Sequence, residues 1–294
     1  MTWQFTLTGL LIGALVGLTG MGGGSLMTPV LVIVFGFQPT YAVGTDILHG
    51  AIFKSFGAIR HRRLGTVHAR LAALMFLGSG PMSLAGVAVA GWFKHRYGAS
   101  TQTVEGYAVG AALVAGGIGF LVKSAVTKGV KPDDAPFLLA RRDKIIAVTI
   151  GAVFGFVVGL TSVGSGTFFG LVMMLAYPLT MPKIVGTDIF HAAALLWVAG
   201  LGHLVAGNVD LHATAWLLLG SVPGILVSSH FTVRLPNEAL RATLGIVLTL
   251  SGVKLLKAPG SDWILIGGLC ALALGLAGYG LRARLAPGPR VENA

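Results

Sequence analysis

Charged side chains are scarce in this sequence, and acidic ones are especially rare. Asp, Glu, Lys and Arg make up 11% of the residues, whereas hydrophobic residues make up 54% and the mean hydropathy is +0.83. Soluble globular domains carry about 25% charged residues. The composition therefore excludes an ordinary soluble domain and indicates that lipid surrounds much of the chain.

Cysteine and the common motifs of cofactor chemistry are also nearly absent. The single cysteine, Cys270, excludes a disulfide framework and a cysteine-built metal site. No Gly-x-x-x-x-Gly-Lys run is present for nucleotide-driven pumping. Ser25 and Ser165 lack the context of a catalytic nucleophile. The basic excess lies between apolar runs without the pattern of a nucleic-acid module. We therefore predict no enzyme, cofactor, metal or nucleic-acid partner.

Long apolar runs are what the sequence does contain. Each is close to the length of about 20 residues that spans a bilayer as a helix. The runs are 3–36 (interrupted), 39–59, 67–93, 103–122, 145–177 (interrupted), 182–205, 209–232, 238–256 and 262–281. This pattern predicts an all-α integral membrane protein.

The chain also contains an internal repeat. Residues 9–81 align with residues 151–223 at a constant offset of 142, without a gap and with 24 identities. The identities cluster in 17–24 with 159–166, 43–49 with 185–191, and 78–81 with 220–223. Such self-similarity indicates a duplicated structural unit. We divide the chain into a first repeat (1–122), a cytoplasmic linker (123–144), a second repeat (145–257), and an additional helix with a basic tail (258–294).

The loops that follow the second apolar run predict how the copies are oriented. The first reads RHRRLGTVHAR, whereas its partner reads GHLVAGNVDLH and contains no Lys or Arg. By the positive-inside rule the two loops face opposite sides of the membrane. Inverted copies need an odd number of crossings, which five elements supply if each interrupted run is a hairpin of two short helices. The amino terminus then lies outside.

Glycine clusters interrupt the first apolar run of each copy and predict breaks in the helix. Broken backbone at membrane depth is tolerated only where protein or a watery cavity satisfies it. Capping hydroxyls would start two half-helices whose positive ends converge on an anion. The candidate substrate-binding residues here are Gly22, Gly23, Gly24, Ser25, Gly164, Ser165, Gly166 and Thr167, with Ser25 and Thr167 as caps. The alternative is that these glycines merely allow close helix packing.

A Gly-Thr-Asp-Ile-x-His run occurs at 44–49 and again at 186–191, inside apolar segments. Burying an ionisable group in a membrane costs about 3 kcal/mol or more, which favours a function. The further candidate substrate-binding residues are Thr45, His49, Thr187 and His191, and the candidates for proton coupling are Asp46 and Asp188. In the alternative interpretation, the aspartates only satisfy free backbone N–H groups of the broken hairpins.

Lys54 has no counterpart in the second copy, because position 196 is leucine. Two interpretations stay open for this lysine. It is either an asymmetric ligand for an anion, or a side chain that extends toward the basic residues near Arg60.

The first-copy motif resembles the TauE/SafE sulfite exporter family. The resemblance rests on Leu-Thr-Gly-x-Gly-Gly-Gly-Ser at 18–25, Pro29 and Ala-Val-Gly-Thr-Asp at 42–46, and it covers roughly residues 9–256. It implies a secondary transporter in the cell (inner) membrane that exports a small sulfur-containing anion, such as sulfite or an organosulfonate. The alternative function is a channel or an importer for another small solute, with proton coupling through the aspartates.

The second copy departs from this pattern. Ser165 replaces Gly23, and Leu171 replaces Pro29. These differences predict a site with only approximate two-fold symmetry. Long apolar faces, such as that of 262–281, leave room for a homodimer.

Overall fold

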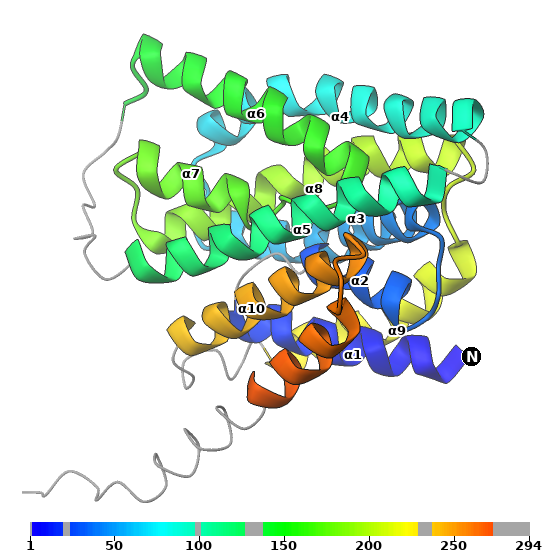
Figure 1. The fold of residues 1–294 in the computed structure, drawn as a ribbon. Coiled ribbons are helices and arrows are strands. Elements are labelled where there is room, and N and C mark those ends of the chain that lie inside the picture. Colours follow the sequence, from blue (N-terminus) through cyan, green and yellow to red (C-terminus); the bar gives the residue numbers. More distant parts are fainter. Residues whose placement is uncertain (1, 20–23, 98–100, 127–137, 229–236, 273–294) are drawn as a thin grey trace, which may run out of the picture.

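Helices form all the regular structure in the described part of the chain. The computed structural model describes residues 2–19, 24–97, 101–126, 138–228 and 237–272 (Figure 1). The labelled helices are α1 (Thr2–Thr19), α2 (Gly24–Ile33), α3 (Pro39–Arg63), α4 (Ala69–Tyr97), α5 (Thr101–Val126), α6 (Arg141–Thr161), α7 (Phe168–Ala176), α8 (Met181–Val205), α9 (Leu211–Ser228) and α10 (Asn237–Leu255). An apolar helix, Ser261–Leu272, follows α10. The all-α prediction is confirmed.

Several helices are suited to a membrane by their length and composition. Among the residues that the structure describes, four helices are long and apolar enough to cross one: Ala69–Phe93, Gln102–Val122, Arg141–Thr161 and Met181–Val205. The outer surface carries large apolar side chains, including Trp3, Val205 and Trp263, which are 67%, 90% and 79% exposed. Such a surface fits lipid better than water.

The two halves of the chain form equivalent sets of helices. The bounds of α3 and α8, 39–63 and 181–205, differ by the repeat offset of 142 at both ends. Figure 1 shows α4 beside α6 at one edge of the bundle, α1 beside α9 at the other, and α3 and α8 between them. Each copy therefore packs its first helix against the fourth helix of the other copy.

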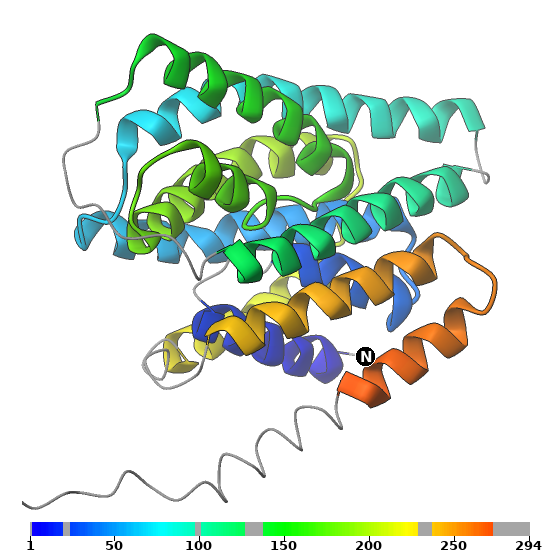
Figure 2. The ribbon, with the colours of Figure 1, turned by 60° about the vertical axis from the view of Figure 1, so that its left-hand side comes forward.

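Equivalent helices from the two copies run antiparallel where they meet. Along α3 and α8, Leu48 lies against Gly200, whereas Gly57 lies against Ile189. Helices α5 and α10 cross in the same sense, and Figure 2 shows them side by side, with the Ser261–Leu272 helix folded back beside α10. Inverted copies require such antiparallel pairs, but the side of the membrane that each end faces stays a prediction.

Glycines bring the outer helix pairs into close contact. A Cβ atom added at Gly220 of α9 would lie 1.9 Å from the Thr6 carbonyl oxygen of α1. At the equivalent Gly78 of α4, it would lie 2.1 Å from the Val148 carbonyl oxygen of α6. Small residues let the backbones of membrane helices approach closely. The packing interpretation therefore applies to these glycines.

The glycines of the second cluster instead interrupt a helix. Helix α6 ends at Thr161 and α7 begins at Phe168. Between them Ser162, Gly164 and Gly166 have φ values of 63°, 133° and 99°, a region that L side chains rarely adopt and glycine tolerates. We call residues 162–167 the second break, and the prediction of a break there is confirmed. The two helices that flank it are unequal, with 21 and 9 residues.

The first cluster also separates two helices. Helix α1 ends at Thr19, and α2 begins at Gly24. Gly22 and Gly23 lie outside the described residues. Gly24 and Ser25 form the first turn of α2, but their side-chain environment also lies outside the description. The predicted helix at 262–281 is described only as far as Leu272.

Candidate functional site

The second break lies along the buried face of α3 and contacts it at two levels. The Ser162 hydroxyl donates a hydrogen bond to Asp46 Oδ2 over 2.8 Å. The Lys54 ammonium donates to the Ser165 hydroxyl over 2.7 Å. Eight residues of helix correspond to about 12 Å of rise. The second break is thus held against α3 by hydrogen bonds at two levels, one to Asp46 and one from Lys54.

Asp46 joins three parts of the chain through one oxygen. Besides Ser162, Oδ2 accepts hydrogen bonds from the Thr28 hydroxyl and backbone N–H at 2.5 and 3.2 Å. Among the described residues, Oδ1 has no hydrogen-bond partner. The contact with the Thr28 N–H, on α2, agrees with the structural interpretation, in which Asp46 satisfies a backbone N–H group of the broken hairpin. Asp46 is only 1% exposed, so Oδ1 is buried as well as without a hydrogen bond among the described residues.

Lys54 is buried in the centre of the bundle and is only 2% exposed. Its ammonium is attracted electrostatically by Asp188 and Asp46. A buried charge needs such partners, because its desolvation costs several kcal/mol. The interpretation in which Lys54 extends toward Arg60 is wrong, since its hydrogen bond to Ser165 holds the side chain at the second break.

Thr45 and His49 face α9 rather than the second break. The Thr45 hydroxyl accepts the Asp210 backbone N–H at 3.0 Å, at the start of α9. His49 Nε2 lies 2.8 Å from the Ser221 hydroxyl in the middle of α9. These two candidates therefore join α3 to α9, whereas Asp46 on the same helix faces α2 and the second break.

The equivalent residues of the second copy make the same contacts with α4. The Thr187 hydroxyl accepts the His68 backbone N–H at 2.9 Å, and His191 Nε2 lies 2.8 Å from the Ser79 hydroxyl. Asp188, on the same helix, is 5% exposed. The structure thus brings Asp46, Asp188, Lys54 and Ser165 within one electrostatic cluster, which we call the central cluster, and turns the threonines and histidines toward neighbouring helices.

Thr167 does precede α7, but the prediction that its hydroxyl caps this helix is wrong. Its hydroxyl makes no capping hydrogen bond. A capping residue normally has an extended backbone, whereas Thr167 has φ −100° and ψ −74°, and its N–H bonds to the Gly164 carbonyl oxygen. The Thr167 Oγ1 atom is buried and has no hydrogen-bond partner among the described residues.

Three polar contacts were missed by sequence reasoning. Thr28 and Ser162 reach Asp46, although the equivalents of these two positions in the other copy are glycines, Gly170 and Gly20. The only sequence signal for these two residues was that they differ from their equivalents, because the repeat alignment draws attention to residues that the two copies share. Buried Glu105 of α5 accepts a hydrogen bond from the Thr40 hydroxyl, and its place in an apolar run was a visible signal.

The described residues contain no group of three or more His, Cys, Asp and Glu side chains arranged to hold a metal ion. An apolar pocket of about 420 Å³ lies beside the second break, between α5 and α6, and reaches Thr161 and Phe168. The central cluster consists of a lysine, two carboxylates and a hydroxyl, groups that can interact with a small ion through charge and hydrogen bonds.

Residues 5–255 match the family model for the sulfite exporter TauE/SafE. The chain belongs to the TauE/SafE family. Among its curated relatives are three proteins of Bacillus subtilis (strain 168), each named as a probable membrane transporter protein. YjnA is 36% identical over 87% of this chain and 100% of its own length. YdhB and YunE are 24% and 26% identical over 84% of this chain, and over 96% and 94% of their own lengths.

Membership of the TauE/SafE family agrees with the sequence interpretation at the level of class. The chain is a multi-pass membrane protein of a transporter family, as the apolar helices and the names of its relatives indicate together. No solved structure matches the chain. The description of the family names sulfite as an exported substrate.

Proposed function

We propose that this protein is a secondary transporter of the cell (inner) membrane that exports a small sulfur-containing anion, such as sulfite or an organosulfonate. The central cluster is the proposed binding site. The observation that carries the proposal is the hydrogen bond between buried Lys54 and Ser165. It joins the one lysine of the bundle centre among the described residues to a helix break.

A buried ammonium beside a helix break is well suited to hold an anion reversibly. Lys54 interacts electrostatically with Asp188 and Asp46, so an anion would compete with these carboxylates for the ammonium. Competition of this kind limits affinity and favours release. The Ser165 hydroxyl supplies a second hydrogen-bonding group at the same point.

The second break gives the site a means to change shape. Its residues Gly164 and Gly166 have backbone conformations that glycine tolerates and other residues rarely adopt. Helix segments that meet at such interruptions can move separately. If the anion takes the place of Ser165 on Lys54, the break loses its contact with α3 at Lys54 but keeps its contact at Asp46 through Ser162. We propose that this change accompanies transport.

The membrane potential supplies a driving force for export. A negative cell interior drives each anionic charge outward with about 2.3 kcal/mol per 100 mV. Export of sulfite or a sulfonate therefore requires no coupling ion. This argument supports anion binding at Lys54 as the first role of the site.

The proposal is tested by sulfite flux from proteoliposomes of purified protein. The Lys54→Met variant should lose flux, and Ser165→Ala should reduce it. Leu196→Met is the matched control, because it places the same side chain at the equivalent buried position of the other copy. Sulfite flux that persists in Lys54→Met, with the protein folded, would remove Lys54 from the site.

The second candidate is a channel or an importer for another small solute, coupled to protons. Asp46 favours it, because an intramembrane carboxyl with one buried oxygen outside any hydrogen bond among the described residues resembles the groups of proton relays. The same proteoliposomes distinguish the candidates. Flux that follows an imposed pH gradient, and not an imposed potential, supports proton coupling.

A further inference from the structure

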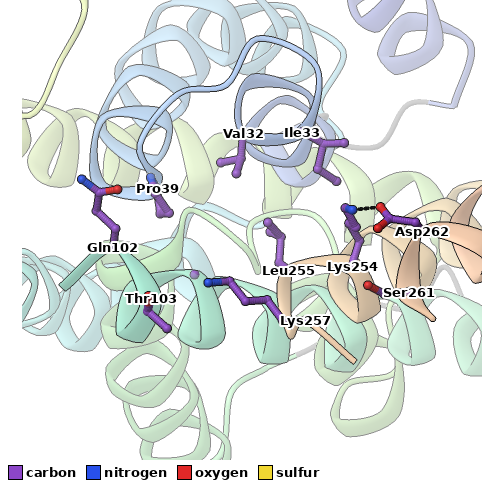
Figure 3. Close-up of a pocket in the computed structure, with 11 residues that line it drawn as sticks. Val32, Ile33, Pro39, Gln102, Thr103, Lys254, Leu255, Lys257, Ser261 and Asp262 are labelled. Carbon is purple, nitrogen blue, oxygen red and sulfur yellow. Dashed lines mark ion pairs between the residues drawn. The ribbon is translucent and has the colours of Figure 1, made fainter. Parts of the chain in front are cut away.

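A second pocket lies at the surface and shares no lining residue with the central cluster. It has a volume of about 560 Å³ and is formed by the end of α2, the starts of α3 and α5, the end of α10 and the helix that follows it (Figure 3). Its lining combines apolar side chains, including Val32, Ile33 and Leu255, with polar ones, including Gln102, Thr103 and Ser261. Pockets for small organic ligands have about 300–1,000 Å³ and the same mixture.

The pocket contains two lysines, and only one of them forms an ion pair with a described residue. Lys254 forms an ion pair with the neighbouring Asp262, at the start of the Ser261–Leu272 helix, which Figure 3 marks with a dashed line. Lys257 forms no ion pair with any residue that the structure describes. Figure 3 shows Lys257 extending from the end of α10 toward the start of α5, where Gln102 and Thr103 lie. The charge of Lys257 is therefore directed at polar groups of the pocket.

The backbone at Lys257 is unusual for a lysine. Its φ is 52°, in the left-handed region. Helices α3 and α8 each end with the same conformation two residues after their last residue, and there it falls on Gly65 and Gly207, with φ 68° at both. Glycine is the usual residue at this place because a Cβ atom costs about 1 kcal/mol. A lysine in its place carries a conformational cost that glycine would avoid.

The pocket is close to the central cluster along two helices. Thr28 of α2 binds Asp46, and Val32 lies one turn further along, in the pocket wall, which is about 6 Å of rise. Next to the pocket-lining residues Pro39 and Gly106, the Thr40 hydroxyl donates to buried Glu105. The pocket and the central cluster are thus separate sites.

We propose that this pocket binds an amphipathic anion, with a single sulfonate or phosphate headgroup on Lys257, Gln102 and Thr103 and a short apolar tail against Val32, Ile33 and Leu255. Such a ligand uses both the polar and the apolar part of the lining. Two sources provide this chemistry, namely a soluble organic anion and the headgroup of an anionic lipid. The inference goes beyond the proposed transport site, which lies at Lys54.

The test uses purified full-length protein in a neutral detergent, titrated with butanesulfonate. Lys257→Gly and Lys257→Gln should each bind about tenfold more weakly or worse, because a hydrogen bond to a charged group is lost. Lys144→Gln, in the first turn of α6 and outside the pocket, should bind as the unchanged protein does. Lys257→Gly should also unfold at the same or a higher temperature, because glycine suits the left-handed backbone, so that weaker binding is not a folding defect.

A second arm distinguishes the sources of the ligand. The protein is placed in nanodiscs of phosphatidylcholine, with and without phosphatidylglycerol. If butanesulfonate does not bind, but phosphatidylglycerol raises the unfolding temperature in a way that Lys257→Gly abolishes, the pocket binds a lipid headgroup. If neither probe depends on Lys257, the inference is overturned.

The outcome for this pocket is separable from that for the transport site. Lys54→Met should lose sulfite flux and keep the Lys257-dependent binding of butanesulfonate. If butanesulfonate binding instead depends on Lys54 and not on Lys257, the pocket inference fails and the central site stands. Lys257-dependent binding in a protein that moves no sulfite would overturn the proposed function alone.

Discussion

His49 and Ser221 meet across the interface of α3 and α9, with His49 Nε2 2.8 Å from the serine hydroxyl. The equivalent residues, His191 and Ser79, meet at the same distance across α8 and α4. In both copies the histidine belongs to a central helix and the serine to an outer one. The two pairs therefore hold the centre of the bundle to its edges in the same way.

Removing either serine should destabilise the protein by a similar amount. Ser221→Ala and Ser79→Ala each leave a buried ring nitrogen unsatisfied, at a cost of about 1–2 kcal/mol. Thermal unfolding in detergent measures the loss. In a double-mutant cycle with His49→Leu, Ser221→Ala should show coupling, whereas it should add independently to Ser79→Ala. Absence of coupling between His49 and Ser221 would show that the contact contributes nothing to stability.

Alanine substitutions at two glycines should have opposite effects. Gly220→Ala forces a Cβ atom to 1.9 Å from the Thr6 carbonyl oxygen and must push α1 away from α9, which we expect to cost about 1–3 kcal/mol. Gly91→Ala, within α4, meets nothing within 4 Å and should stabilise by up to about 1 kcal/mol, since alanine is the better helix former. Thermal unfolding of both variants checks the sign, and equal effects would contradict the packing at Gly220.

Repetition along the chain predicted much of this fold. The offset of 142 that aligns the Gly-Thr-Asp-Ile-x-His runs also relates the bounds of α3 and α8. The repeat predicts the fold because the residues that the copies share lie on the equivalent buried helix in each copy. The glycine cluster at 164–166 predicted a break for a local reason, since glycine tolerates backbone that other residues avoid.

The partners within the site were beyond sequence reasoning. Ser162 is 116 residues from Asp46, and only the packing of α2, α3 and the second break brings the two together. The direction of Lys54 was also open, because a flexible stem can reach water or turn inward. At Thr167, tertiary packing fixed a backbone that a local preference for capping does not predict.

Asp46→Asn should separate the two interpretations of this residue. An asparagine oxygen can still accept the bonds from Thr28 and Ser162, so we expect yield and unfolding temperature close to those of the unchanged protein. A proton on Asp46 removes the same charge as the substitution. The flux of the unchanged protein should therefore approach that of the variant as pH falls, and the variant should respond less to pH.

The measurement is sulfite flux over a range of pH in proteoliposomes, with Asp188→Asn as the matched variant of the other copy. Poor yield of Asp46→Asn together with an unaltered pH profile would support the structural interpretation, in which the carboxylate mainly satisfies the Thr28 N–H.

Cysteines at equivalent loop positions should test whether the copies are inverted. Leu64 and Ala206 each follow the last residue of α3 or α8, share a helical backbone conformation and are exposed. Basic residues precede Leu64 and not Ala206, so Leu64→Cys should face the cytoplasm and Ala206→Cys the outside. With Cys270→Ser as background, a membrane-impermeant maleimide should label Ala206→Cys in intact cells and Leu64→Cys only after permeabilisation.

The same labelling also places the surface pocket. Asn208, just after Ala206, packs against Gly44 near the start of α3, and Pro39 at that start lines the pocket. Labelling of Ala206→Cys from outside would therefore put the pocket of Lys257 at the outer face, open to solutes there and to the outer leaflet. Labelling of both cysteines from one side would contradict the inversion, because the antiparallel crossing of α3 and α8 holds their ends apart.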